Sequence, residues 1–588
     1  MSDYQTPLRE LSFVIDELCG VAKQFANTVQ YNDLGLGEDL TAALIGEAAK
    51  LGENVLAPLR RSADLQGARW EDQKIILPDG FVEAIEQLGQ GGWQGISASE
   101  QYGGQGLPEV FSTATFEIWN SANIAFSLGP MLTIAAALAI EQHGTESQKD
   151  TFLRKMFSGE WMGTMNLTES GAGSDLGSMK TQAVPEADHY RIYGQKIFIT
   201  WGDHEATENI VHLVLGRLPN ASEGSRGISL FIVPKYLADE QGQWTIRNDV
   251  FPISNEHKLG IHGSPTCVMA FGNKEGAVGY LLGAENDGLR CMFTMMNEAR
   301  LKVGVQSLGV AEAAYQKALS YACERVQGGR AIAEHPDVRR MLMTMNSLVQ
   351  AMRAVSYVEA VTLDQAHSST DENLRCLSQS RIDLMIPIIK AWLTELGIEI
   401  ASLGIQVHGG MGYIEETGAA QYLRDIRITP IYEGTNGIQA ADLLGRKLAG
   451  DDGVMMKGLL QALGETVVAA NQYSSLAPIA AYLKASADDL DQSTRTLLSR
   501  FSDRADYAML SSSDFLMQAG YVFGGWQLLR SALICIKQIQ SGSSDSFYQT
   551  KISVVAFYMS HLLPRAKAHA MAISQADDAV FSVKLTNL

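Results

Sequence analysis

Cysteine is scarce in this chain of 588 residues, and no two cysteines form a C-x-x-C pair. The positions are Cys19, Cys267, Cys291, Cys323, Cys376 and Cys535. This spacing predicts neither a disulfide framework nor a zinc site, so we expect buried thiols. Basic residues are also outnumbered, since 46 Lys and Arg against 66 Asp and Glu give a net charge of -20. That deficit argues against general affinity for nucleic acid or anionic lipid, but a few local cations can still hold a nucleotide phosphate.

Long apolar runs and targeting signals are missing as well. No apolar stretch reaches the roughly 18 residues that a membrane span requires, so we expect no transmembrane segment. The opening MSDYQTPLRELSF carries early acidic residues and lacks the basic start and apolar block of a signal peptide, which predicts a cytoplasmic protein.

Several catalytic signatures are also missing. The sequence contains no HExxH, no G-x-S-x-G, no P-loop and no G-x-G-x-x-G after a strand. It therefore lacks the motifs that would indicate a metalloprotease, a serine hydrolase, an NTPase or a Rossmann dehydrogenase. The 11 histidines are scattered, so no metal site is expected.

The chain length predicts three or four domains, by a soft prior of about 100 to 200 residues each. Apolar residues recur at helical spacing in the amino-terminal part, short β-rich runs follow, and long amphipathic helices return afterwards. We therefore divide the chain into a helical domain (1–161), a β domain (162–275), a helical bundle (276–448) and a further helical domain (449–588). The fold class is α+β.

The candidate catalytic residue is Glu433, in the tetrad Tyr432-Glu433-Gly434-Thr435. A carboxylate beside a glycine is usually a solvated turn residue. Its surroundings favour another interpretation, because residues 407–413 read VHGGMGY and let the backbone approach a bulky ligand. Residues 435–439 add short polar groups, and we expect an apolar helical run to begin at Ala440. A carboxylate between two such strips lies where a ligand passes.

These segments resemble the acyl-CoA dehydrogenase flavoprotein family, in which the active-site base lies in an IYEGT segment after a QV-GG-G strip. Further strips resemble the family in the same order, and they are YGGQG at 102–106, TESGAGSD at 168–175, KIFITWG at 196–202 and YACER at 321–325. The resemblance covers about residues 40–448. The first residues and 449–588 look like the larger bacterial branch, which includes fatty acyl-CoA and 3-methylmercaptopropionyl-CoA dehydrogenases.

The resemblance implies an N-terminal helical domain, a middle β domain, a helical bundle, an additional C-terminal bundle and FAD as cofactor. The implied FAD contacts are Met165, Leu167, Thr168, Gly173, Ser174, Phe198, Thr200, Arg325, Gln327, His335, Gln406, Gly409, Gly410, Thr435 and Gly437. Among these, Thr200 would bind flavin N5, Phe198 would pack on the ring system, and Arg325 would reach the FAD of a neighbouring subunit. The implied substrate contacts are Ser174, Asn297, Arg300 and Gly434, with Asn297 standing where the family has an acid.

The implied reaction is α,β-desaturation of an acyl-CoA thioester. Glu433 would remove the α proton while a hydride leaves Cβ for flavin N5, so the base and Thr200 would mark the two sides of the acyl chain. We expect a fatty acyl-CoA substrate, with 3-methylmercaptopropionyl-CoA as the alternative. An electron-transferring flavoprotein is the expected electron acceptor, and the added C-terminal domain predicts a homodimer.

Two other classes remain open at this level. An acyl-CoA oxidase would share these strips and pass electrons to oxygen. A DNA-binding relative of the fold would need a basic face, and the residues from Asp451 onward carry 11 positive against 12 negative charges, which supplies none.

Overall fold

The computed structural model describes residues 4–26, 28–31, 34–584 and 586, apart from the side chains at positions 29, 294, 295 and 297. The chain forms two compact units, which we call unit 1 (Met1–Thr6 and Gly46–Lys302) and unit 2 (Pro7–Ile45 and Val303–Leu588). The amino-terminal helices α1 (Leu8–Ser12) and α2 (Val21–Gln24) thus belong with the carboxyl-terminal helices.

Unit 1 contains the predicted helices of the amino-terminal part and a hairpin that the sequence pattern did not predict. Its helices are α4 (Ala57–Gln66), α5 (Phe81–Gln90), α6 (Glu109–His143) and α7 (Glu146–Phe157), while α3 (Glu38–Leu51) and α8 (Gly288–Glu324) supply residues to both units. The hairpin joins β1 (Arg69–Glu71) to β2 (Lys74–Ile76) through Asp72 and Gln73. Both turn residues have positive φ, the geometry that suits a two-residue hairpin turn.

Helix α6 contradicts the expectation that no segment is long and apolar enough to span a membrane. Among the described residues it is the one helix that passes that test, and 89% of its most apolar window is buried inside the protein. Its backbone leaves helical geometry at Asn123, where the side-chain oxygen accepts from the Phe126 N–H at 3.2 Å. The helix is a buried core element of unit 1, which is why its sequence carries so few charges.

The middle part of unit 1 is a β-sheet, as the β-rich runs predicted, and its strands pair in both parallel and antiparallel directions. Within the described residues it has eight strands, with β10, β11, β5, β12, β7, β6 and β3 in spatial order and β4 beside β5 and β6. The strands are β3 (Trp161–Asn166), β4 (Gln182–Glu186), β5 (His189–Thr200), β6 (Asn209–Arg217), β7 (Ile228–Pro234), β10 (Val250–Asn255), β11 (Thr266–Phe271) and β12 (Ala277–Leu282), with β8 (Tyr236–Ala238) and β9 (Trp244–Arg247) as a separate hairpin. Two of the short β-rich runs in the sequence, 190–194 and 196–200, join into the single strand β5.

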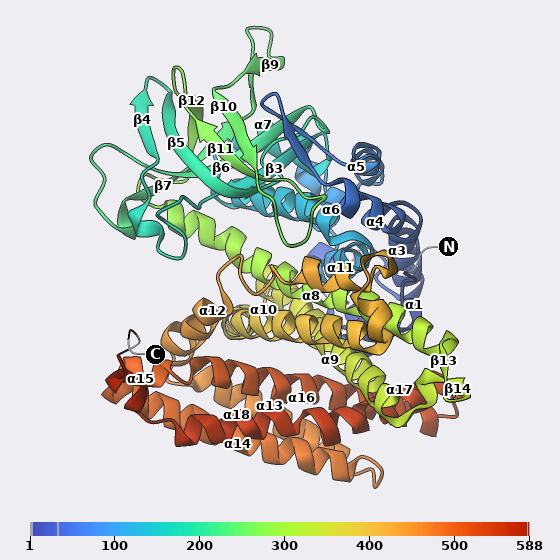
Figure 1. Cartoon of the computed structure of the whole chain (residues 1–588). Helices are drawn as coiled ribbons and strands as arrows, with labels where there is room; N and C mark the ends of the chain where they lie inside the picture. The colour runs from blue at the N-terminus through green and yellow to red at the C-terminus, as the bar shows by residue number, and fades with distance from the viewer. Residues whose placement is uncertain (1–3, 27, 32–33, 585, 587–588) are drawn as a thin grey trace. The chain divides into compact units, whose positions relative to one another are not determined.

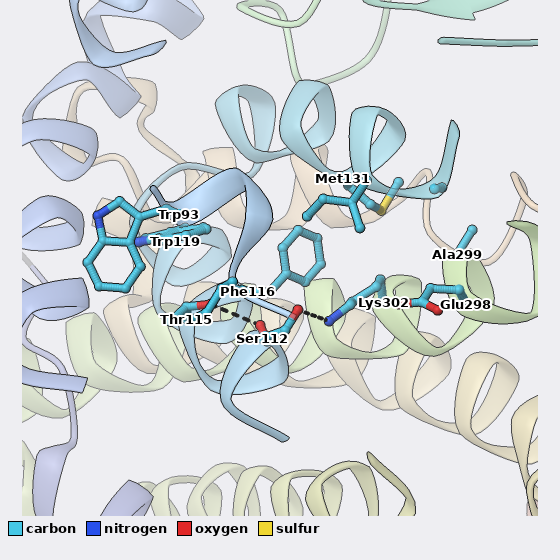
Figure 2. Close-up of a pocket in the computed structure, with 12 residues that line it drawn as sticks. Trp93, Ser112, Thr115, Phe116, Trp119, Met131, Glu298, Ala299 and Lys302 are labelled. Atoms are coloured by element: carbon cyan, nitrogen blue, oxygen red, sulfur yellow. Dashed lines mark hydrogen bonds between the residues drawn. The ribbon is translucent and has the colours of Figure 1, made fainter. Parts of the chain in front are cut away.

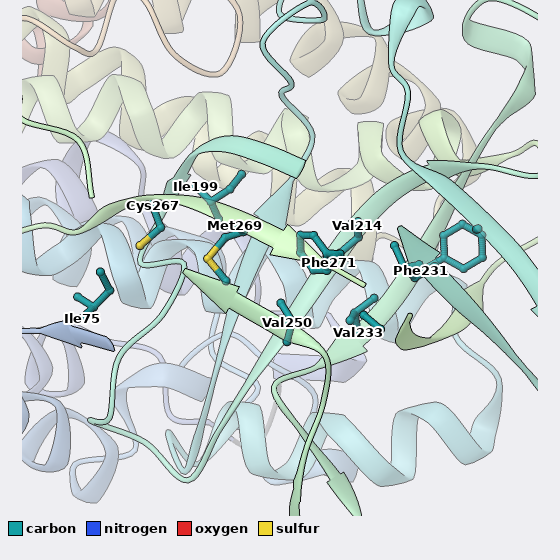
Figure 3. Packing of buried hydrophobic residues seen from close by; sticks show 12 residues of the cluster. Ile75, Ile199, Val214, Phe231, Val233, Val250, Cys267, Met269 and Phe271 are labelled. Atoms are coloured by element: carbon teal, nitrogen blue, oxygen red, sulfur yellow. The ribbon is translucent and has the colours of Figure 1, made fainter. Parts of the chain in front are cut away.

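One apolar cluster forms the core of this sheet (Figure 3). Its members come from most of the strands and from the unpredicted hairpin: Ile75, Ala183, Ile192, Ile199, Val214, Phe231, Val233, Val250, Cys267, Met269, Phe271 and Ala277. Burial of this side leaves Phe198, on β5, on the exposed side of the sheet.

Unit 2 consists mainly of long helices (Figure 1). Its remaining helices are α9 (Pro336–Ser368), α10 (Glu372–His408), α11 (Ala419–Ile426), α12 (Asn436–Asp442), α13 (Val454–Ala470), α14 (Ala477–Asp503), α15 (Ala505–Met509), α16 (Ser512–Gln540), α17 (Ser546–Phe557) and α18 (Pro564–Gln575), with a short hairpin of β13 (Val326–Gln327) and β14 (Arg330–Ala331). Helix α12 starts at Asn436, four residues before the predicted start, because the Thr435 hydroxyl caps it by accepting from the Ile438 N–H.

The additional helices pack against the preceding bundle through a close helix–helix contact. Trp392 of α10 is fully buried, and a Cβ at Gly520 of α16 would lie 2.3 Å from its ring. Glycine at that position lets α16 approach the indole directly.

The cysteine prediction holds for four residues and is wrong for Cys323 and Cys376, which are exposed on helices of unit 2.

Candidate active site

The predicted base lies in a strained turn between α11 and α12. Glu433 is half-buried with φ +54°, and Gly434 follows at φ +87°. A residue with a Cβ in this region costs about 1–3 kcal/mol and persists only where its surroundings fix it. The preceding Tyr432 hydroxyl donates to Gln306 Oε1 of α8 at 2.5 Å. Burial and the Glu433 charge raise the pKa of Tyr432, so this phenol stays protonated and remains a donor.

Helix α10 binds the other side of the same turn. The Lys390 ammonium donates to Gly434 O at 2.8 Å and to Asn436 Oδ1 at 3.0 Å. Gln439 of α12 donates to the carbonyls of Glu433 and Gly434, both at 3.3 Å. The turn that carries the candidate base is therefore held by three helices of unit 2.

A buried ion pair anchors the loop of unit 1 that is predicted to bind the flavin. The Glu169 carboxylate accepts from Lys196 Nζ at 2.9 Å, from the N–H groups of Lys180 and Thr181, and from the Thr181 hydroxyl at 2.6 Å. Burial lowers the pKa of Lys196 to about 8, against the raising effect of Glu169. Burial would raise the pKa of Glu169, but the Lys196 charge and these hydrogen bonds outweigh it and hold that pKa below its ordinary value.

The small residues of this loop are exposed, unlike the buried ion pair that anchors it. Gly173 and Ser174 are exposed, Thr168 is half-buried, and a Cβ at Gly171 or Gly173 would meet no atom within 4 Å. Open space in front of these backbones fits a bound group. Met165 is buried within β3, so its side chain belongs to the core.

Phe198 and Thr200 flank the buried Ile199 on β5, the pattern that strand alternation produces. The alternation is nevertheless interrupted, because the register with β11 shifts by one residue between Ile199 and Lys196. This bulge puts Phe198 at φ +61° with 59% of its side chain exposed. The bulge therefore exposes an aromatic ring on one side of the sheet, next to a half-buried hydroxyl at Thr200.

The predicted glycine strip of unit 2 follows the end of α10. Gly409 and Gly410 are exposed and a Cβ at either would meet no atom within 4 Å. His408 packs instead, with its ring stacked on Tyr321 at 4.4 Å and Nδ1 2.7 Å from Gly404 O. Among the described residues no group of His, Cys, Asp and Glu is arranged to hold a metal ion.

Three of the predicted FAD contacts of unit 2 lie at or next to the β13–β14 hairpin. Arg325 and Gln327 are exposed, and the His335 ring lies 3.0 Å from Gln327 O, which fixes the hairpin to the start of α9. Arg300, in the unit 1 part of α8, is buried. The Asn297 side chain lies outside the described residues.

A small cavity lies between α6 and the first part of α8 in unit 1 (Figure 2). Its volume of about 10 Å³ fits roughly one water molecule, so it takes no substrate. Trp93, Phe116, Trp119 and Met131 line it, together with a polar group in which Lys302 donates to Ser112 Oγ at 2.8 Å and pairs with Glu109. Burial, and then the Glu109 charge, raise the pKa of the neighbouring Glu298 to about 8.

Four family descriptions match nearly the whole chain. They are the acyl-CoA dehydrogenase N-terminal domain over residues 43–160, its middle domain over 164–273, its C-terminal domain over 286–448, and the acetyl-CoA dehydrogenase C-terminal-like domain over 459–584. The chain belongs to the acyl-CoA dehydrogenase family. It is accordingly an oxidoreductase with FAD as its cofactor.

Relatives match along the full chain. It is 42% identical to the 3-methylmercaptopropionyl-CoA dehydrogenase of Ruegeria pomeroyi, over 99% of this chain and 100% of that enzyme. Identity to a butyryl-CoA dehydrogenase of Syntrophomonas wolfei is 32%, over 99% and 98%. The structure of an acyl-CoA dehydrogenase from Bacillus anthracis complexed with FAD aligns with a TM-score of 0.74 at 21% identity, covers 93% of this chain and 90% of that one, and shows the shared fold.

Sequence reasoning missed the residues that support the candidate site. Glu169 lies inside the strip 168–175, in which only Thr168, Gly173 and Ser174 were predicted as contacts, and Lys196 begins the strip that supplied Phe198 and Thr200. Lys390 lies 43 positions before Glu433 in an apolar helical run. One signal could have revealed Lys390. It is a lysine at a position where helical spacing otherwise places apolar, buried residues.

Proposed function

We propose that this protein desaturates 3-methylmercaptopropionyl-CoA between Cα and Cβ. The observation that carries the proposal is the 42% identity to the Ruegeria pomeroyi enzyme, which extends over the whole of both chains. The identity to the Syntrophomonas wolfei butyryl-CoA dehydrogenase is ten points lower over a similar length. This comparison favours the thioether substrate over the fatty acyl-CoA that we first expected.

The chemistry assigned to the chain is proton abstraction by Glu433. Its carboxylate takes the α proton, and the negative charge that develops on the thioester oxygen needs a donor, a role that the family resemblance gives to the Glu433 N–H. FAD, when bound, accepts the hydride that leaves Cβ. The turn geometry supports this role, because a strained residue held by surrounding hydrogen bonds keeps one orientation.

Features in each unit fit FAD. Phe198 offers an exposed ring in unit 1, and the open backbone at Gly171 and Gly173 leaves room for a bound group. In unit 2 the same openness occurs at Gly409 and Gly410. An electron-transferring flavoprotein is the electron acceptor we propose, and rapid peroxide formation with substrate alone would identify an oxidase instead.

A short fatty acyl-CoA is the second candidate, favoured by the butyryl-CoA dehydrogenase match. The deciding experiment is anaerobic bleaching of the bound flavin by 3-methylmercaptopropionyl-CoA, by its isostere pentanoyl-CoA, in which CH2 replaces sulfur, and by butyryl-CoA. We expect the rate constant of flavin reduction divided by the Kd of the acyl-CoA to be at least about tenfold higher for the thioether than for pentanoyl-CoA, or about 1.4 kcal/mol. Equal values would show that sulfur is not recognised and would support the fatty acyl reading.

A further inference from the structure

Lys390 is a fully buried cation on α10 that donates to Gly434, in the turn of the candidate base, and to Asn436, at the start of α12. We propose that Lys390 is the positioning residue of that turn and that it holds Glu433 in the orientation needed to take the α proton. This inference rests on the proposed function, since it assigns Lys390 a part in the same reaction.

The contacts of Lys390 support a strong restraint. A buried ammonium loses its hydration, and this cost is offset only where good acceptors surround it. Two acceptors of Lys390 are Gly434 O at 2.8 Å and Asn436 Oδ1 at 3.0 Å, on both sides of Thr435. Hydrogen bonds from a charged donor are about twice as strong as neutral ones, so the turn cannot shift without a large cost.

The contacts of Asn436 extend this restraint along α10. Its amide donates to Glu395 Oε1 at 2.8 Å and to Thr394 Oγ1 at 3.0 Å, one turn beyond Lys390. Lys390 thus binds the carbonyl side of Asn436 while the next turn of the helix binds its amino side. Gln439 also donates to the backbone carbonyls of Glu433 and Gly434, so both carbonyl groups are held in place.

The restraint has a direct consequence for the base. Glu433 has φ +54°, whereas a relaxed residue with a Cβ prefers negative φ. A change of φ to a negative value would redirect the Cα–Cβ bond and move the carboxylate. Since a displacement of about 1 Å can lower a rate about 100-fold, loss of Lys390 should affect proton abstraction far more than binding.

The test is Lys390→Met in the full-length, flavin-loaded protein. We expect kcat for the preferred acyl-CoA to fall about 100-fold. Flavin content and the Kd of the enoyl-CoA product, measured by the flavin absorbance shift, should stay within about twofold of the wild type. Deuteration at Cα should give a larger primary isotope effect than in the wild type, because proton transfer becomes slower.

The matched control is Lys551→Met, which removes another buried lysine of unit 2 far along the chain from the turn. It should be less stable but keep the wild-type kcat per flavin and the wild-type isotope effect. If Lys390→Met does not fold, Asn436→Ala removes one acceptor and should lower kcat about tenfold with the same larger isotope effect.

The outcomes separate this inference from the proposed function. A wild-type protein whose flavin no acyl-CoA bleaches would overturn both. Bleaching of the wild type together with unchanged kcat and isotope effect in Lys390→Met, or in Asn436→Ala, would overturn the role of Lys390 alone. Loss of flavin or of product affinity at unchanged kcat per flavin would also overturn it, because that result marks a purely structural lysine.

Discussion

The Lys551 ammonium, on α17, donates to the carboxylate of Glu10, on α1, and so joins residues 541 positions apart. Both side chains are buried, and the ammonium lies 4.9 Å from the centre of the Phe13 ring. Burial lowers the pKa of Lys551, and the Glu10 carboxylate counteracts that shift. The first helix of the chain is therefore held by the additional carboxyl-terminal bundle.

Removal of this pair should destabilise unit 2. Lys551→Met leaves a buried carboxylate without its cation, so we expect a loss of about 3–5 kcal/mol in the free energy of unfolding. Urea denaturation measures the change. Adding Glu10→Gln to this variant should restore part of the loss, and Arg504→Ala, which removes an exposed pair with Asp578, should leave the free energy of unfolding nearly unchanged. A Lys551→Met variant as stable as the wild type would contradict the assignment.

Glu298 should make stability depend on pH. Its pKa is raised from 4.5 to about 8, so between these values the folded state keeps a proton that the unfolded state has released. The free energy of unfolding then falls as pH rises through this window. Glu298→Gln removes the ionisation, and its melting temperature should match the wild type at pH 4 and exceed it at pH 8.5. Equal differences at both pH values would show that Glu298 does not titrate in this way.

Glu169 should determine how tightly FAD is held. Glu169→Gln weakens the pair with Lys196 beneath the loop that carries Thr168 and Ser174, so the loop should lose its fixed position. We expect the Kd of FAD to rise at least about tenfold, or about 1.4 kcal/mol, as measured by flavin fluorescence on dilution. Glu186→Gln, which affects an exposed pair with Arg191, is the control. Unchanged FAD affinity in Glu169→Gln would remove this carboxylate from the cofactor site.

The quaternary prediction is a homodimer that completes the flavin site. Light scattering should give about twice the chain mass of 63.9 kDa. The exposed side chains of Met411, Tyr413 and Ile414 suit coverage by a second copy, and Tyr413 is 84% exposed here. Arg325→Ala should release FAD while the dimer persists. A flavin-loaded monomer or a stable tetramer would exclude this arrangement.

The sequence predicted the helices and strands better than it predicted the residues that hold the candidate site in place. Periodicity indicated the long helices and the β-rich middle part, and a family resemblance singled out Glu433 as the candidate base, because these signals lie within short stretches. Local pattern could not predict that Asn123 interrupts α6 or that a bulge exposes Phe198. Lys390 and Glu169 were missed because their roles depend on contacts with residues that are distant in the chain or belong to another strip.

Glu433→Gln gives the most direct test of the central claim that this carboxylate removes the α proton. The variant keeps the size and shape of the side chain but cannot accept a proton at working pH, so it should retain bound FAD and bind acyl-CoA. Anaerobic mixing with 3-methylmercaptopropionyl-CoA, and then with butyryl-CoA, should bleach the wild-type flavin and leave the variant yellow, with a rate at least about 1,000-fold lower. Bleaching of the variant at a rate near that of the wild type would show that another group is the base.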